Sequence, residues 1–330
     1  MTNKVFHSAN LCEHSFVVTG GAGFIGSHLA EYLVLNKAKK VIVLDDLSNG
    51  TISNLKNIET KSNFEFVEGS ICSLETCEKV FNGADYVLHQ AALCSVPRSI
   101  DNPVATHEVN VSGFLNVLMA AKTASIKRLV YASSSSVYGN SKTLPKKETD
   151  PAAPLSPYAV TKLSNELYAS VFVRNYTMSL TGLRYFNIFG PRQNPNGPYA
   201  AAIPIFITGL LQGKAPVIFG DGSQTRDFTF IENVVQANIK ALFADESVNG
   251  QVFNIAAGGR TAVNELFQLL AELAHSTIKP IYKPSRPGDV KDSNAAIDKA
   301  KEHFDYAPEI NFRQGIEDTW KWYKENFKKS

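Results

Sequence analysis

Tyr158 and Lys162 stand four residues apart in a segment, Tyr158 to Tyr176, whose pattern predicts a helix. At this spacing both side chains lie on one helical face. A free tyrosine has a pKa of roughly 10 and is a poor base at neutral pH, but a nearby ammonium stabilises its phenolate. Such a tyrosine can take a proton from a hydroxyl group and return it. A solvent-facing helix pair has the same spacing, so this alternative stays open.

A serine run, Ser133 to Ser136, directly follows the predicted strand Arg128–Ala132. Serine hydroxyls at the carboxyl end of a strand point into the ligand crevice of a parallel sheet. These hydroxyls are therefore expected beside Tyr158 and Lys162. A plain polar turn is the alternative interpretation of the run.

A glycine-rich turn, Thr-Gly-Gly-Ala-Gly-Phe-Ile-Gly, occupies residues 19–26 between a predicted strand and a predicted helix. Glycines at such a place allow a tight turn and a close backbone approach to a pyrophosphate. The following helix offers N–H groups and a positive dipole end to the phosphates. Asp45 ends the next strand, where it can accept hydrogen bonds from a ribose and would repel a 2′-phosphate, which favours NAD over NADP. The alternative is a glycine turn without a ligand.

Strand-like and helix-like segments alternate through the chain, and most strands are continuous apolar runs. This pattern is typical of an α/β fold with a doubly wound parallel sheet of the Rossmann type, buried on both faces. The predicted strands are Phe16–Thr19, Val41–Leu44, Phe64–Val67, Tyr86–His89, Arg128–Ala132, Thr181–Tyr185 and Gln251–Ile255. The predicted helices are Ile25–Leu35, Leu74–Phe81, Ala105–Ala124, Tyr158–Tyr176 (with Ala159, Leu163, Leu167 and Val171 on one face) and Asn233–Phe243.

The texture changes after Gly190, where prolines interrupt a polar stretch. We therefore expect a dinucleotide-binding domain over residues 1–188 and a smaller α/β substrate-binding domain over residues 189–330. The segment of about residues 229–256 reads as a helix and a strand, and we expect it to return to the first domain.

Composition limits the classes of partner. The 330 residues carry a net charge of +2, so the basic excess typical of nucleic-acid binding is missing. No run approaches the length of a membrane span, and no signal peptide is evident, so we expect a cytoplasmic protein. The four cysteines, Cys12, Cys72, Cys77 and Cys94, match no zinc or disulfide spacing, and no metal is expected.

Together these motifs make the sequence resemble the extended short-chain dehydrogenase/reductases, and closely the bacterial UDP-hexose 4-epimerases that accept N-acetylated sugars. The resemblance runs from about Ser15 to Tyr323. Besides the glycine turn, it is carried by HQAAL (89–93), SVPRS (95–99), SSSSVYG (133–139), SPYAVTK (156–162), LRYFNIFGPRQNPNGPYAAAIP (183–204), GDGSQTRDF (220–228) and RPGDVKDS (286–293).

The resemblance implies Ser134, Tyr158 and Lys162 as catalytic residues and NAD as the cofactor. The residues it implies around NAD are Gly20, Gly23, Phe24, Ile25, Gly26, Asp45, Asn49, Ser70, Ile71, Ala91, Ala92, Leu93, Asn110, Ser133, Tyr158, Lys162 and Tyr185. Those it implies around a UDP-sugar are Ser95, Ser134, Ser136, Tyr158, Asn187, Tyr199, Ala201, Phe219, Arg226, Arg286, Asp289 and Ser293.

The family reaction implied is inversion at C4 of the sugar through a 4-keto intermediate, with Tyr158 handling the proton beside Ser134 and NAD the hydride. A small residue at the position of Ser293 leaves room for an N-acetyl group in this family. The resemblance therefore implies UDP-GlcNAc and UDP-GalNAc as substrates, with UDP-glucose and UDP-galactose as further candidates. It also implies a homodimer formed through residues 103–124 and 158–176.

Two residues depart from the family pattern: Ser70 replaces a usual aspartate, and Asp292 a frequent histidine. Two alternatives stay open on the same scaffold: a UDP-glucuronate epimerase or decarboxylase using Arg98, and a 4-keto-sugar reductase. A 4,6-dehydratase is disfavoured by Ser135 and Ser136, where acidic residues are needed. A non-catalytic Rossmann sensor is the alternative of another class. Arg226 and Asp227 could also form a mere exposed ion pair.

Overall fold

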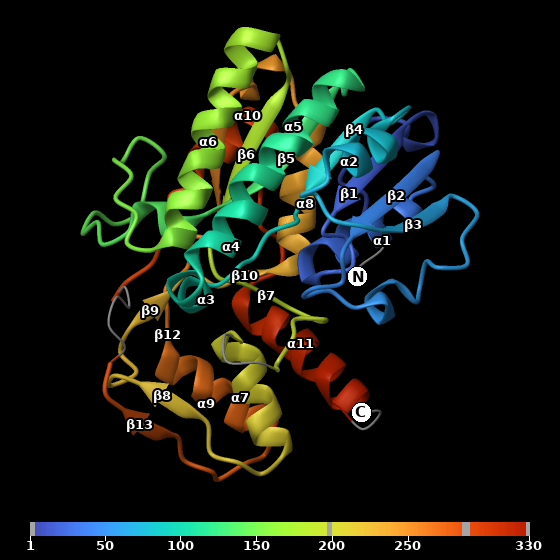
Figure 1. Cartoon of the computed structure of the whole chain (residues 1–330). Helices are drawn as coiled ribbons and strands as arrows, with labels where there is room; N and C mark the ends of the chain where they lie inside the picture. The colour runs from blue at the N-terminus through green and yellow to red at the C-terminus, as the bar shows by residue number, and fades with distance from the viewer. Residues whose placement is uncertain (1–3, 197–199, 286–290, 328–330) are drawn as a thin grey trace.

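A computed structural model describes residues 4–196, 200–285 and 291–327. Its centre is a seven-stranded sheet with the strand order β11-β6-β5-β4-β1-β2-β3 (Figure 1). Every neighbouring pair in this sheet is parallel, which confirms the predicted Rossmann-type fold. The strands are β1 (Ser15–Thr19), β2 (Lys40–Asp45), β3 (Phe64–Glu68), β4 (Tyr86–His89), β5 (Arg128–Ser134), β6 (Leu180–Tyr185) and β11 (Gln251–Ile255).

Helices cover both faces of the sheet, and each face has its own apolar core. The helices α1 (Phe24–Leu35) and α8 (Ile231–Leu242) pack on one face. The helices α2 (Leu74–Phe81), α5 (Gly113–Thr123) and α6 (Pro157–Tyr176) pack on the other. Strands buried on both sides explain why β1 and β2 read as continuous apolar runs rather than alternating ones. Strand β6 is buried along its whole length as well, although it contains Thr181 and Arg184.

The remaining elements lie mainly below the carboxyl ends of the strands (Figure 1). The helices there are α7 (Ala202–Leu211), α9 (Val263–Leu273) and α11 (Phe312–Phe327), and α11 packs against the other two. Short strand pairs accompany them: β8 (Val217–Phe219) with β13 (Ile281–Lys283), β9 (Thr225–Arg226) with β12 (Thr261–Ala262), and β7 (Ile188–Phe189) with β10 (Thr229–Phe230). Helix α10 (Asp298–Phe304) packs beside β11.

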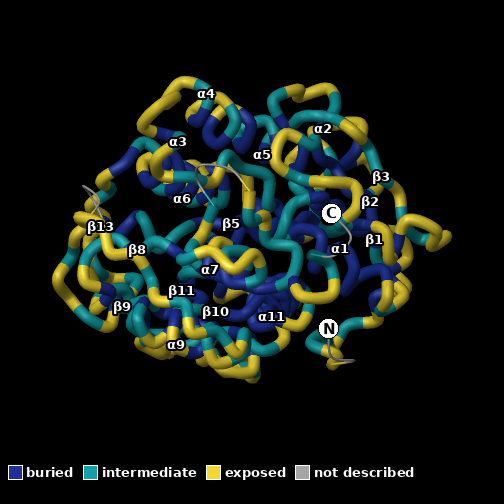
Figure 2. Tube along the Cα trace, turned by 90° about the horizontal axis from the view of Figure 1, so that it is seen from below, coloured by how far each residue is buried: buried dark blue, intermediate teal, exposed yellow. Residues whose placement is uncertain are grey.

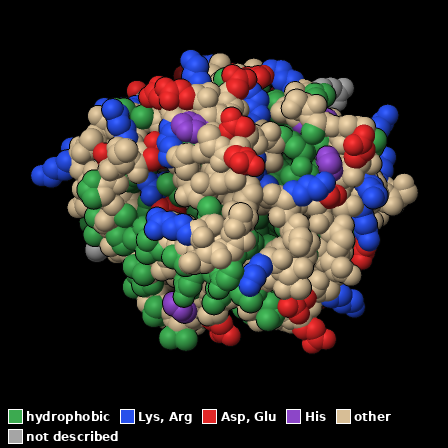
Figure 3. All heavy atoms as spheres, turned by 90° about the horizontal axis from the view of Figure 1, so that it is seen from above, with side chains coloured by type: hydrophobic (Ala, Val, Ile, Leu, Met, Phe, Trp, Pro, Cys, Tyr) green, Lys and Arg blue, Asp and Glu red, His purple; other side chains and the backbone are tan. Residues whose placement is uncertain are grey.

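The segment around residues 229–256 does reach the large sheet, since β11 pairs with β6 over five residues. The domain division at residue 188 stays a prediction. No described helix is both long and apolar enough to cross a membrane. On the face drawn in Figure 3, lysine and arginine side chains lie among aspartate and glutamate side chains.

The helix predicted over Ala105–Ala124 is interrupted. The structure has α4 (Pro103–His107), then a π-helical turn (Glu108–Ser112), then α5. A π turn adds a residue to the helical ladder and commonly marks a functional place. Here it carries Asn110, whose side chain is buried. The short helix α3 (Val96–Asp101) precedes α4 and was not predicted.

Helix α6 buries charged residues and exposes part of its apolar face. Lys162 and Glu166 are 2% and 9% exposed, whereas Leu167 and Val171 are 62% and 47% exposed. Of the four residues predicted on one apolar face, Leu167 and Val171 are therefore exposed, whereas Ala159 is buried and Leu163 is half-buried. Figure 2 shows burial along the whole chain: the central strands of the large sheet are mostly buried, whereas α3 and α4 are largely exposed.

Candidate active site

A cavity of about 1510 Å³ is lined by residues at the carboxyl ends of the strands and by residues of α7 and α11. It lies where the strand order reverses between β1 and β4, the usual ligand position in open parallel sheets. Twenty of the predicted site residues line it: Gly20, Gly23, Phe24, Ile25, Gly26, Asp45, Asn49, Ile71, Ala91, Ala92, Leu93, Ser95, Ser133, Ser134, Ser136, Tyr158, Lys162, Tyr185, Asn187 and Ala201.

Five predicted residues do not line the cavity: Ser70, Asn110, Phe219, Arg226 and Ser293. Tyr199, Arg286 and Asp289 lie outside the described residues. The fold thus brings most of the predicted cofactor-binding and catalytic residues into one cavity. The part of the substrate site predicted to bind the nucleotide is described only in part.

The glycine turn fits a dinucleotide phosphate group. A Cβ on Gly20 would lie 2.6 Å from the amide nitrogen of Ala91, and one on Gly26 would collide with the carbonyl oxygen of Gly20. Gly23 is the N-cap of helix α1, and no side chain caps the helix there. The backbone N–H groups of the first helical turn are therefore left for a ligand in the cavity that these residues line. Backbone N–H groups and the helix dipole at such a start attract phosphate.

Asp45 lies at the end of β2, in the cavity wall. Its carboxylate accepts hydrogen bonds from the backbone N–H groups of Ala22 and Leu47, both at 2.9 Å. Burial raises its pKa, and these N–H donors counteract the rise. The remaining acceptor capacity faces the cavity, which fits the ribose hydroxyls of NAD.

Asn110 does not line the cavity but contacts the backbone of Leu93, a residue that does. Its amide oxygen accepts from the N–H of Leu93 at 2.8 Å, and its amide nitrogen donates to the carbonyl of Leu93 and the hydroxyl of Thr161. The π turn in the helix places this side chain inward, where it fixes the backbone of the cofactor loop 91–93. Ser70 is also outside the wall, and its hydroxyl accepts from the N–H of Cys72 at 3.3 Å.

Tyr158, Lys162 and Ser134 meet in the cavity. Tyr158 and Lys162 are 7% and 2% exposed, so the solvent-facing alternative is wrong. The Lys162 ammonium donates to the carbonyl of Ala132 at 2.9 Å. Ser134 follows at the end of β5, and the thiol of Cys94 lies 3.5 Å from the Tyr158 hydroxyl.

Electrostatics at this cluster follow from burial. Burial raises the pKa of Tyr158 well above its usual value, the neighbouring Cys94 raises it further, and a hydrogen bond with Ser134 lowers it. Burial lowers the pKa of Lys162 to about 8, while Cys94 and Glu166 act in the opposite direction. Lys162 therefore stays largely protonated at neutral pH, one helical turn from Tyr158.

The predicted substrate end is built around a buried carboxylate. Asp227 is fully buried and accepts from the N–H groups of Ala257 and Ala295 and the amide of Asn294, at 3.0, 3.3 and 3.1 Å. The interpretation of Arg226 and Asp227 as an exposed ion pair is therefore wrong.

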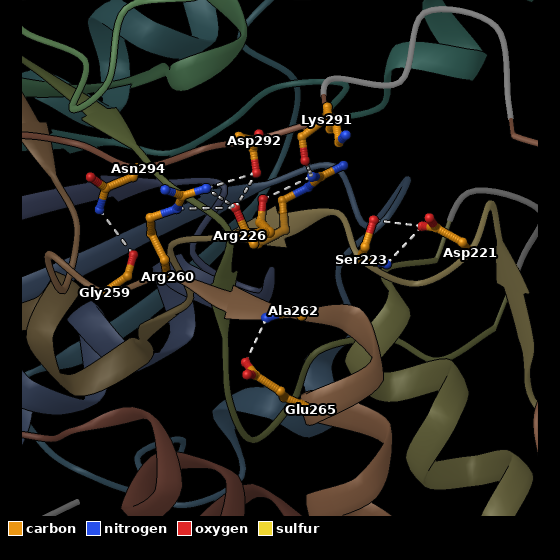
Figure 4. Close-up of polar contacts among 11 residues, drawn as sticks. Asp221, Ser223, Arg226, Gly259, Arg260, Ala262, Glu265, Lys291, Asp292 and Asn294 are labelled. Atoms are coloured by element: carbon orange, nitrogen blue, oxygen red, sulfur yellow. Dashed lines mark hydrogen bonds and ion pairs between the residues drawn. The ribbon is translucent and has the colours of Figure 1, made fainter.

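Ser293 and Arg226 lie next to this carboxylate. The hydroxyl of Ser293 accepts from the Asn187 amide at 3.5 Å, and Asn187 lines the cavity. The Arg226 guanidinium donates to the carbonyls of Thr225 and Lys291, at 2.9 and 3.2 Å (Figure 4).

Asp292, the departure from the family pattern, has a clear structural role. Its carboxylate accepts from the Thr225 hydroxyl at 2.6 Å. It also pairs with the Arg260 guanidinium at 3.0 Å (Figure 4). The N–H of Ser293 donates to the carbonyl of Thr225. These contacts fasten the strand segment that carries Ser293 to β9.

Comparisons with known proteins agree with this geometry. Residues 16–256 match the model of the NAD dependent epimerase/dehydratase family. The chain belongs to this family. A putative UDP-glucose 4-epimerase of Methanocaldococcus jannaschii is 40% identical over 94% of the chain and 98% of its own length.

Two solved structures are similar over nearly their whole length. A UDP-N-acetylglucosamine 4-epimerase from Methanobrevibacter ruminantium, in complex with UDP-N-acetylmuramic acid, has a TM-score of 0.90 at 39% identity, covering 95% of this chain and 99% of that one. A UDP-glucuronic acid 4-epimerase from Bacillus cereus, with UDP-glucuronic acid and NAD, has a TM-score of 0.88 at 32% identity, covering 94% and 99%.

Membership of the epimerase family confirms three predictions: the extended short-chain dehydrogenase/reductase resemblance, an enzyme of the isomerase class, and NAD as cofactor. The roles of individual site residues stay predictions, since only their positions are described here.

In this epimerase-family chain, several cavity residues have no signal in the sequence. Trp322, Tyr323, Asn326 and Phe327 of α11 line the wall, and the Tyr323 hydroxyl donates to the carbonyl of Gln193. Their helix is amphipathic like any surface helix, so local pattern could not find them. Cys94 could have been suspected, because it falls between the two recognised segments 89–93 and 95–99.

Proposed function

We propose that this protein is an NAD-dependent 4-epimerase that interconverts UDP-GlcNAc and UDP-GalNAc, with UDP-glucose and UDP-galactose as further substrates to test. The observation that carries the proposal is the meeting of Tyr158, Lys162 and Ser134 in the same cavity as the glycine turn. A proton-transferring tyrosine beside a dinucleotide site is suited to reversible oxidation of a hydroxyl group.

NAD, Tyr158 and Lys162 have separate roles in the proposed reaction. Bound NAD supplies hydride acceptance and return at C4 of the sugar. Tyr158 takes the proton of the 4-hydroxyl and gives it back. The ammonium of Lys162 favours the tyrosine anion by its charge. Burial of both groups strengthens this attraction, since the local dielectric constant is low.

Ser134 is oriented to donate. Its oxygen accepts from the N–H of Ser136 at 3.1 Å and from the Ser136 hydroxyl at 2.9 Å. With these acceptor positions occupied, its own proton is available for the Tyr158 oxygen or a sugar hydroxyl. Ser134 thus lowers the pKa of Tyr158, in the direction a base requires.

Small side chains support an N-acetylated sugar. Ala201 lines the cavity, and Ser293 lies against Asn187, another lining residue. Neither side chain would fill the space that an acetamido group needs. The similar structure of the UDP-N-acetylglucosamine 4-epimerase from Methanobrevibacter ruminantium supports the same choice.

The glucuronate alternative has weaker support from the described residues. It needs a cation toward the sugar carboxylate, and Arg98 was its candidate. The Arg98 guanidinium donates instead to the Asn49 amide oxygen at 2.8 Å, and Arg98 is not among the residues that line the cavity. A 4-keto-sugar reductase on the same scaffold is tested below by cofactor consumption.

We also propose a homodimer formed through α4 and α6. Val104, Val160, Leu167 and Val171 are exposed by 76%, 49%, 62% and 47%, and α4 packs against α6. Within the two predicted interface segments, Leu118 and Phe172 are buried and belong to the core. The cytoplasmic location stays a prediction.

The decisive experiment follows the anomeric protons of UDP-GlcNAc by NMR with the purified protein. Formation of UDP-GalNAc to a fixed ratio, without consumption of added NADH, is the expected result. A Ser293→Tyr variant should lose this activity and keep conversion of UDP-glucose. Conversion of UDP-glucuronate alone, or stoichiometric consumption of NADH, would overturn the proposal.

A further inference from the structure

A buried ion pair lies directly behind the proposed reaction site. Glu166 on α6 and Arg184 on β6 are 9% and 5% exposed. The guanidinium donates to both carboxylate oxygens, from Nε at 2.9 Å and from Nη2 at 2.7 Å. Arg184 also stacks over the ring of Tyr138, with 4.7 Å from its Cζ to the ring centroid.

Such a pair needs an explanation beyond stability. Withdrawing two charges from water costs several kcal/mol, and apolar residues of similar volume often stabilise a protein as well or better. The pair is therefore weak evidence for stability, and its contact with a residue of the cavity wall indicates a functional explanation.

The carboxylate reaches the site through Ser133. The Ser133 hydroxyl donates to the Glu166 Oε1 at 2.5 Å, and Ser133 lines the cavity. Ser133 and Arg184 are register partners on β5 and β6, so both approach Glu166 from the same side. With its proton committed to Glu166, the Ser133 oxygen presents only acceptor positions to the cavity, and the adjacent Ser134 is held in place.

The carboxylate also acts on Lys162. The two residues are one helical turn apart on α6, both on its buried stripe. Tyr158 and Glu166 lie one helical turn before and after Lys162 on α6. The charged or titratable groups that act on Lys162 are Glu166 and Cys94, and Lys162 in turn acts on His89 of β4. His89 is neutral, because burial lowers its pKa to about 3. Glu166 is thus the described carboxylate that offsets the buried ammonium.

We propose that Glu166 is a positioning residue for the reaction: it holds the Ser133 hydroxyl and supplies the negative charge that faces the Lys162 ammonium beside Tyr158. Arg184 in turn holds Glu166 in this orientation. The inference rests on the proposed 4-epimerase function, because it assigns Lys162 and Tyr158 their roles in proton transfer.

The first test is the pH profile of Glu166→Gln, a change that keeps the side-chain shape. Burial already lowers the pKa of Lys162 to about 8, and Glu166 raises it. Loss of the carboxylate therefore lowers it further, and the ammonium is lost at lower pH. We expect kcat to fall by roughly tenfold at pH 8.5 and by less than about threefold at pH 6.5. A uniform loss across the pH range would indicate mere structural damage and overturn the proposal.

Two further variants test the same proposal if Glu166→Gln folds poorly. The double variant Glu166→Leu with Arg184→Met replaces the pair by apolar side chains and should retain the melting temperature. It should still lose activity at alkaline pH; a wild-type pH profile would overturn the proposal. Ser133→Ala should lower kcat without moving the alkaline limb, and wild-type turnover would contradict the part assigned to Ser133.

A titration without substrate separates this inference from the proposed function. The pKa of the Lys162 ammonium, followed by NMR on lysine labelled with carbon-13 at Cε and assigned by the signal that a Lys162→Met variant lacks, should be lower in Glu166→Gln than in the wild type. An unchanged titration overturns the inference, whether or not UDP-GlcNAc is a substrate. Failure of epimerisation by the wild type alone overturns only the proposed function. Glu272→Gln, a change in a surface ion pair on α9, is the control and should alter neither reading.

Discussion

The sulfur of Cys94 lies 3.5 Å from the hydroxyl oxygen of Tyr158, although the two residues are 64 positions apart. This contact raises the pKa of the tyrosine, against the effect of Ser134. The thiol is part of the cavity wall, and it is exposed there.

Cys94→Ala should therefore move the acidic limb of the pH–rate profile to lower pH. The reason is that removal of Cys94 lowers the pKa of Tyr158, so more of the tyrosine is ionised at a given pH. The measurement is kcat against pH for UDP-GlcNAc conversion. An acidic limb that stays in place, or moves upward, would show that the thiol does not influence the tyrosine.

Tyr158→Phe should lower kcat by a factor on the order of 10² to 10⁴, the usual range for a positioned acid–base group. The ring stays in its buried place, so the melting temperature should change little. NAD content after purification should match the wild type. Turnover near wild type would refute the assigned role.

Gly26→Ala should abolish NAD retention. The added Cβ would collide with the carbonyl oxygen of Gly20, a backbone atom that cannot move aside without reshaping the phosphate-binding turn. Gly259→Ala is the matched control, since a Cβ at that position meets nothing within 4 Å. The readout is bound NAD, released by denaturation and measured by absorbance. Equal NAD content in both variants would be incompatible with the turn as its binding site.

Asp292→Asn should raise the KM for UDP-GlcNAc without changing kcat, because the contacts with Thr225 and Arg260 fasten the segment that carries Ser293. Exposed ion pairs contribute about 0–1 kcal/mol, so the rise should be about fivefold or less. Hydrogen bonds from Thr225 and Arg260 lower the pKa of Asp292, so its contribution is present at neutral pH and is lost as the pH falls through that lowered value. A fall in kcat with an unchanged KM would contradict this role.

Leu167→Glu should shift the protein from dimer to monomer, measured by light scattering after size-exclusion chromatography. A charge in the centre of an apolar contact remains without a partner and costs several kcal/mol. Val5→Glu, at a residue 63% exposed on the N-terminal segment, is the control. An unchanged molar mass for Leu167→Glu, or a wild-type monomer, would rule out the proposed interface.

The sequence by itself determined the large sheet and the cofactor side of the site. Each of these features is local: an apolar run that ends in glycines, an aspartate at the end of β2, and the helical spacing of Tyr158 and Lys162. In a parallel sheet the carboxyl ends of all strands lie at one edge, so residues recognised separately along the chain had to meet there. The same argument brought Ser134 beside Tyr158.

Only the tertiary structure decided which face of α6 is buried. Its apolar residues Leu167 and Val171 point outward, whereas Lys162 and Glu166 are buried, because Arg184 and Ser133 on neighbouring strands supply the partners that a charged group needs in the core. The sequence likewise could not predict that α11 lines the cavity, or that Asp292 contacts Arg260 and Thr225. Both depend on contacts between segments far apart in the chain, and periodicity reports only what neighbours on one element share.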